Sequence, residues 1–127
     1  MEAGVERLVA ITLLLTCASH IAAPRAWGAL FDGIAARGDA AGLIYAAIHL
    51  PLGLVVVAFH PVWQGAGLLV TLIGWALLVK GTIHLLWPRL AGRLLQAGDA
   101  RGRASRLRLA GWVMLPLALA VAWIAAR

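Results

Sequence analysis

One lysine and three histidines lie inside stretches that are largely apolar, and they are the first candidates for chemistry in this sequence. Lys80 and His84 are four residues apart, a spacing that places both on one face of a helix. His49 and His20 lie inside two other apolar stretches. A lysine in the middle of a membrane costs about 2.5–3.5 kcal/mol on insertion scales, so it needs a polar partner or access to the headgroups. We therefore take these four residues as the candidate polar site.

The candidate polar site is compatible with two kinds of chemistry. Lys80, His84 and His49 could line a path for a proton, another ion or a small solute. His20 and His84 each lie near the end of an apolar stretch, and paired imidazoles on facing helices are the axial ligands of a b-type haem. The alternatives without chemistry are a lysine that reaches the lipid phosphates and histidines that bond to backbone carbonyls or to Ser19.

The sequence offers little for catalysis. It has no metal-binding motif, no glycine-rich phosphate loop and no Ser/His/Asp arrangement. Cys17 is the only cysteine and is expected to be a small buried residue, so an intrachain disulfide is excluded. We expect no Asp or Glu inside the apolar stretches, because Asp32, Asp39 and Asp99 fall in loops. The prediction is a non-enzymatic protein without a metal or cofactor, with haem b as the alternative.

The apolar stretches themselves predict a membrane protein. The chain has 127 residues, of which 63% are hydrophobic and 13% charged, whereas soluble domains carry about a quarter charged residues. A membrane-spanning helix needs roughly 20 apolar residues, and the length allows one domain over residues 1–127. We predict an all-α integral membrane protein, an antiparallel four-helix bundle. Its expected spans are residues 5–23, 40–59, 65–87 and 107–126.

The connections between the spans are expected to contain short helices at the membrane interface. Apolar residues recur at helical spacing after the first span, at Trp27, Leu30, Phe31 and Ile34. A similar pattern follows the third span, at Leu90, Leu94 and Leu95. Residues 98–103 then have the composition of a flexible, solvated turn.

The arginines predict the orientation of the spans. Most of them lie in the first and third connections, so both connections are expected in the cytoplasm and both termini outside. The net charge of +6 comes largely from the segment Arg89 to Arg108, which we expect to contact anionic lipid headgroups rather than nucleic acid. Tryptophans near the span ends are expected to be interface anchors, namely Trp27, Trp63, Trp87 and Trp123.

Three glycines predict close helix packing in the third span. Gly67, Gly74 and Gly81 are seven residues apart and form a stripe along one face. Such a stripe lets the backbone of another helix approach closely. The partner is either the second span, which carries residues at the same spacing, or another copy of the chain.

One segment of the sequence resembles a known group of proteins. It reads His60-x-x-Trp63, then Thr71-x-x-Gly74-Trp75-x-x-x-x-Lys80-Gly81, then Pro88. This pattern resembles small bacterial four-helix inner-membrane proteins of unassigned function. In that group Asn often follows the histidine, where this chain has Pro61. The resemblance implies a bacterial cell membrane and a role for His60 and Lys80, but it implies no activity.

Three classes of function follow from the sequence. The first is an accessory or self-assembling membrane module, homo-oligomeric or bound to another membrane protein. The second is an ion, proton or small-solute transporter or channel element that uses the candidate polar site. The third is a b-type haem electron-transfer anchor. The small size and the lack of catalytic motifs favour the first class.

Overall fold

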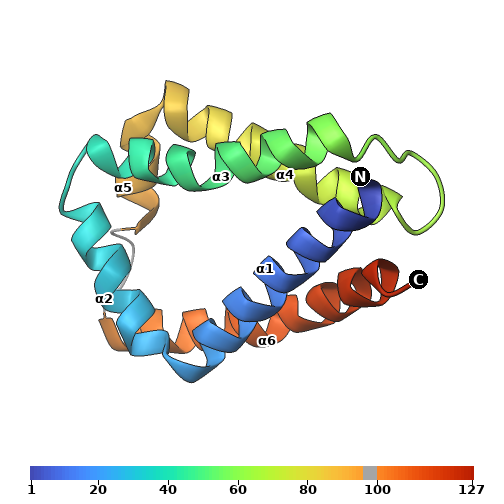
Figure 1. Ribbon diagram of the computed structural model, residues 1–127. Helices are drawn as coiled ribbons and strands as arrows, with labels where there is room; N and C mark the ends of the chain where they lie inside the picture. Colours follow the sequence, from blue (N-terminus) through green and yellow to red (C-terminus); the bar gives the residue numbers. More distant parts are fainter. Residues whose placement is uncertain (96–99) are drawn as a thin grey trace.

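The structure, a computed structural model, describes residues 1–95 and 100–127, and within these residues it contains helices and no strand (Figure 1). The helices are α1 (Glu2–Ala22), α2 (Pro24–Ala35), α3 (Ala40–Phe59), α4 (Leu68–Leu86), α5 (Pro88–Leu95) and α6 (Ala100–Ala125).

Four of these helices are long and apolar enough to cross a membrane. They are α1, α3, α4 and the part of α6 from Gly102 to Ala125, in agreement with the four spans expected from the apolar stretches. The two short helices, α2 and α5, occupy the connections in which the sequence predicted them. The side chains of Leu94 and Leu95, which belong to that prediction, lie outside the described part of the chain.

Two of the long helices do not begin where the expected spans begin. The helix expected from residue 65 begins at Leu68, because Gly65 adopts a positive φ of 60° in the turn that precedes it. The helix expected from residue 107 begins at Ala100. Residues 100–103, expected to be part of a solvated turn, are therefore helical, and their alanine and arginines are strong helix formers. Residues 98 and 99 of that expected turn, including Asp99, lie outside the described residues.

Prolines end three of the helices. Ala23, His60 and Trp87 each precede a proline, and each leaves the helical region, with φ between −133° and −127°. A proline disfavours helical geometry at the residue before it, while its own fixed φ suits the first turn of a new helix. Pro24 and Pro88 accordingly begin α2 and α5.

The long helices pack as two pairs (Figure 1). α3 packs along α4, and α1 packs along α6, so the pairs are formed by the central and the terminal parts of the chain. α2 and α5 lie at the end away from the two termini, where α2 packs on α6 and α5 on α3. Both termini lie near the α3–α4 connection in Figure 1.

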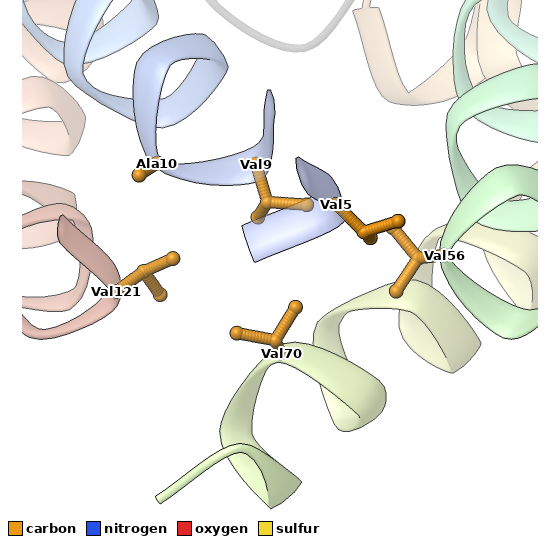
Figure 2. Packing of buried hydrophobic residues seen from close by; sticks show 6 residues of the cluster. All are labelled: Val5, Val9, Ala10, Val56, Val70 and Val121. Atoms are coloured by element: carbon orange, nitrogen blue, oxygen red, sulfur yellow. The ribbon is translucent and has the colours of Figure 1, made fainter. Parts of the chain in front are cut away.

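The two pairs meet in an apolar cluster close to the N-terminus. Figure 2 shows side chains from four helices converging there: Val5, Val9 and Ala10 of α1, Val56 of α3, Val70 of α4 and Val121 of α6. Branched side chains lose little rotamer freedom when they pack. We call this region the junction, because it joins one helix pair to the other.

Glycines allow α3 and α4 to approach closely within their pair. A methyl group on Gly81 would lie 2.7 Å from Leu50 Cγ, and one on Gly74 would collide with Val56. On the opposite helix, a methyl group on Gly53 would lie 2.6 Å from the backbone nitrogen of Leu78. Gly74 and Gly81 of the glycine stripe therefore face α3, and so do not form an outer surface for a second copy. Gly67, the third glycine of the stripe, faces the α3–α4 connection, where a methyl group would lie 2.7 Å from Val62 Cγ1.

Candidate functional site

A hydrogen-bonded triad of polar side chains lies at the junction. His60 follows α3, Thr71 belongs to α4 and Glu6 belongs to α1. His60 Nδ1 is 3.0 Å from Thr71 Oγ1, and His60 Nε2 is 3.1 Å from Glu6 Oε1. We call these three residues the junction triad. Its His60–Glu6 contact connects the two helix pairs, because α1 belongs to one pair and α3 to the other.

The junction triad is buried, with access from one side. The side chain of His60 has no exposed area and Thr71 is 1% exposed, whereas 17% of the Glu6 side chain is exposed. His60 is the residue that caps α3, directly before Pro61, and its ring contacts Thr71 of α4. A buried imidazole needs a partner at both ring nitrogens, and the triad supplies both.

The hydroxyl of Thr71 limits where the hydrogens of the triad can be. Thr71 Oγ1 lies 2.7 Å from the carbonyl oxygen of Val62 and 3.0 Å from that of His60. Carbonyl oxygens only accept hydrogen bonds, and a hydroxyl has one hydrogen to donate. Since the shortest contact is to Val62, the hydroxyl donates there and accepts from the Nδ1–H of His60.

This assignment leaves one hydrogen for the contact between His60 and Glu6. With Nδ1 protonated, Nε2 either accepts from a protonated Glu6 or, as an imidazolium, donates to the Glu6 carboxylate. Both arrangements contain the same number of protons. They differ in whether one hydrogen is bound to Glu6 Oε1 or to His60 Nε2, two atoms that lie 3.1 Å apart. The contact between His60 and Glu6 therefore carries one hydrogen, either on the Glu6 carboxyl group or on Nε2 of His60.

The segment singled out by its sequence pattern contributes two side-chain pairs near the junction. His60 and Thr71 form the hydrogen bond described above. Trp63 and Trp75 form a ring contact with centroids 6.5 Å apart, and both indoles are exposed. The spacing of the pattern thus corresponds to contacts between the start of the α3–α4 connection and the first turns of α4.

Lys80, His84 and His49 come together around a residue that the sequence did not single out, Tyr45 of α3. The Tyr45 ring lies 5.3 Å from the His84 ring and 5.7 Å from the His49 ring, and Lys80 Nζ is 5.9 Å from its centroid. We call these four residues the Tyr45 cluster. Lys80 is an exposed residue, and its ammonium group lies over the face of the Tyr45 ring.

The two histidines of the Tyr45 cluster differ in whether their Nδ1 atom has a hydrogen-bond partner. His49 Nδ1–H donates to the backbone carbonyl of Tyr45 over 2.7 Å. His84 is 6% exposed, and its Nδ1 has no hydrogen-bond partner among the described residues. A buried ring nitrogen without a partner costs free energy, so a neutral polar group that supplied a hydrogen bond to this nitrogen would be favoured there.

His20 is separated from the Tyr45 cluster by other rings. It stacks on Trp27 with centroids 4.4 Å apart, and contacts from Trp27 to Phe31 and from Phe31 to Tyr45 continue the chain of rings. Its Nδ1–H donates to the Thr16 carbonyl over 2.8 Å. Two side chains of α2 thus stand between His20 and the ring that contacts His84. Trp27, expected as an interface anchor, is half-buried and donates its indole N–H to Ser19.

One expectation about charge is wrong. We expected no carboxylate within the spans, but Glu6 lies within the expected first span, residues 5–23, and inside α1, which is long enough to cross a membrane. Glu6 contacts His60, a residue 54 positions away, so sequence separation hid the pairing. The feature of the sequence that could have indicated a site at Glu6 is its position between Val5 and Val9, which are both buried residues of α1. Glu6 and Tyr45 are the two site residues that were not predicted from the sequence.

The described residues contain no group of three His, Cys, Asp or Glu side chains arranged to hold a metal ion. Cys17 is buried on α1, where a methyl group on Gly111 of α6 would lie 3.0 Å from its carbonyl oxygen. Comparisons with models of protein families, with curated proteins and with solved structures find no match to this chain.

Proposed function

We propose that this chain is a proton-linked transport element of a bacterial inner membrane, in which the junction triad holds the transferable proton. The observation that carries the proposal is the 3.1 Å contact between a fully buried imidazole and a carboxylate from the other helix pair. Ionisable side chains within spans are costly, and chains of Glu and His recur in proton relays of pumps and transporters. A purely structural contact at the junction would be cheaper to build from apolar residues.

The proposed orientation gives the triad and the Tyr45 cluster different access. With both termini outside, as the arginine distribution favours, the triad lies toward the outer surface and the Tyr45 cluster toward the cytoplasm. Thr71 and His84 are thirteen residues apart on α4, which corresponds to roughly 20 Å along a helix. We propose that the proton passes from Glu6 and His60 toward the Tyr45 cluster.

The packing of the glycine stripe favours a transport element over a module that assembles through this stripe. Self-assembly through that stripe needs the small residues on an outer surface, whereas Gly74 and Gly81 face α3. An accessory or homo-oligomeric module is the alternative, and it requires no movement of protons. Purified protein that changes no proton flux, but forms a stable oligomer of defined native mass in detergent, would favour that alternative.

Proton flux in liposomes tests the proposed function. The purified chain is reconstituted with a pH-sensitive dye inside, and a pH gradient is imposed in the presence of a potassium ionophore that removes the membrane potential. We expect flux above that of protein-free liposomes, and its loss in Glu6→Gln, which keeps the side-chain size but cannot transfer the proton. Glu2→Gln is the matched control, because Glu2 is an exposed carboxylate on the same helix.

The outcomes of this experiment are distinct. Equal flux in Glu6→Gln and wild type would remove the junction triad from any transport path. Loss of flux in Lys80→Met as well would extend the path to the Tyr45 cluster, whereas unchanged flux in that variant would exclude Lys80 from the mechanism.

A further inference from the structure

A groove between α2 and α6 combines positive charge with apolar walls. Its volume is about 740 Å³, and it lies at the end of the molecule away from the termini. Arg25 and Asp32 line it from α2, and Ser105, Arg108, Leu109 and Trp112 line it from α6. The junction triad and the Tyr45 cluster contribute no residue to this lining, so the groove is a separate feature.

The charges in the groove favour an anion. The carboxylate of Asp32 forms an ion pair with Arg103, which offsets its negative charge. Arg25 and Arg108 make no hydrogen bond or ion pair within the part of the chain that the structure describes, and both are exposed. Two guanidinium groups without carboxylate partners, beside the hydroxyl of Ser105, offer the donors that a phosphate group accepts.

The apolar part of the groove favours an amphiphile over a free anion. Leu109 is 61% exposed and Trp112 is 55% exposed, and both follow Arg108 along α6 toward the apolar part of that helix. A hydrocarbon chain attached to a phosphate held by Arg108 would run along these side chains. Tryptophan is also the residue that prefers the level of the headgroups, where one end of the ring is wet and the other apolar.

We propose that this groove binds the headgroup of an anionic phospholipid, with its phosphate between Arg25 and Arg108 and an acyl chain along Leu109 and Trp112. The inference rests on the membrane placement of the proposed function but not on proton transfer. The shared chemistry is a phosphate ester, which could come from a lipid or from a soluble phosphate, and the presence of apolar walls commits the proposal to the lipid.

Lipid binding to the purified full-length chain in detergent tests the proposal, with native mass spectrometry as the readout. The probes are phosphatidylglycerol, which is anionic, phosphatidylcholine, which has the same phosphodiester but no net charge, and inorganic phosphate. We expect one tightly retained phosphatidylglycerol. Its affinity should be at least about tenfold weaker in the double variant Arg25→Gln/Arg108→Gln, because each arginine near an anionic lipid surface strengthens binding roughly fivefold.

Two further variants make the result specific. The double variant Arg7→Gln/Arg127→Gln removes the same charge at the other end of the molecule and should bind phosphatidylglycerol as the wild type does. Trp112→Ala should weaken phosphatidylglycerol binding although both arginines are present. Thermal unfolding of each variant without lipid checks that the fold is intact.

Three results would overturn the proposal. The first is an equal loss of affinity in the Arg7/Arg127 control, which would indicate a general effect of net charge. The second is binding of inorganic phosphate with the same dependence on Arg25 and Arg108 but no retained lipid, which would indicate a soluble phosphate site. The third is equal retention of phosphatidylcholine and phosphatidylglycerol. None of these results depends on whether the chain moves protons.

Discussion

Thr71 is the residue on which the junction triad depends most, because its hydroxyl contacts one ring nitrogen and two carbonyl oxygens. Removing it leaves the Nδ1–H of His60 buried without an acceptor. Thr71 was visible in the sequence only as part of a pattern that includes His60 and Trp75. Its role depends on the α3–α4 connection, because this connection places His60, eleven positions earlier in the chain, against Thr71 of α4.

We expect Thr71→Val to lower the free energy of unfolding by about 1–3 kcal/mol, the usual cost of an unsatisfied buried polar group. Chemical unfolding in detergent micelles, followed by circular dichroism, measures the change. Thr82→Val is the matched control, because Thr82 is exposed and its hydroxyl donates to the Leu78 carbonyl one turn earlier. A change below about 0.5 kcal/mol is expected there. Equal losses in the two variants would contradict the role assigned to Thr71.

The positions of His20 and His84 bear on the haem alternative. The two histidines were the candidate axial ligands, but Trp27, Phe31 and Tyr45 form a series of ring contacts between them. We therefore expect protein purified from cells supplied with ample haem to show no Soret band, before or after reduction with dithionite. A sharp Soret band with α and β bands after reduction, lost in His20→Ala and His84→Ala, would contradict this expectation and favour electron transfer.

At the scale of the elements, the helices follow from simple features of the sequence. The lengths of the apolar stretches predicted four long helices, and α1, α3 and α4 each end two residues before a proline. The start of α6 was less predictable, because glycines and charges near residue 100 resemble a turn, while alanine and arginine in the same stretch favour a helix. In such a mixed segment, the long apolar helix that continues toward Ala125 favours the helical conformation, because extending an existing helix costs less than starting one.

Close packing of α3 on α4 predicts a specific effect of glycine substitution. A methyl group at Gly53 would lie 2.6 Å from the Leu78 nitrogen and 3.1 Å from the Gly74 carbonyl oxygen, and these backbone atoms cannot turn aside as a side chain can. We expect Gly53→Ala to destabilise the protein by about 1–3 kcal/mol through overpacking.

Gly33→Ala is the control for this prediction. Gly33 is also helical, but nothing lies within 4 Å of a methyl group there. This change should therefore stabilise the protein by about 0.5–1 kcal/mol, the difference in helix propensity. Thermal unfolding in detergent compares the two variants, and a stabilised Gly53→Ala would show that α3 and α4 are not in close backbone contact.

At the scale of the whole molecule, the pairing of helices could not be predicted from the sequence. An even number of spans predicts that the termini share one side, but the apolar stretches do not state that α1 packs on α6 or that α1 meets α3 at the junction. For this reason Glu6 was not predicted as a site residue, although Lys80, His49 and His84 were. Residues close in sequence or on one helix face can be related by spacing, whereas a contact across 54 positions requires the fold.

The orientation of the molecule is open to a direct test. The arginines of the first and third connections predict that both termini lie outside the cytoplasm. Fusion of alkaline phosphatase to Arg127 should therefore give an active enzyme, and fusion of green fluorescent protein at the same position should give dark cells. The reverse result would place the junction triad at the cytoplasmic side and invert the proposed direction of access.

The central claim is that His60 and Glu6 share one proton across the two helix pairs. Nuclear magnetic resonance of the protein with ¹⁵N-labelled histidine reports the hydrogens on each ring nitrogen. We predict that Nδ1 of His60 carries a hydrogen, and that the Nε2 signal shifts in Glu6→Gln but not in Glu2→Gln. A His60 ring with a bare Nδ1, whose signals are the same in all three proteins, would contradict the claim.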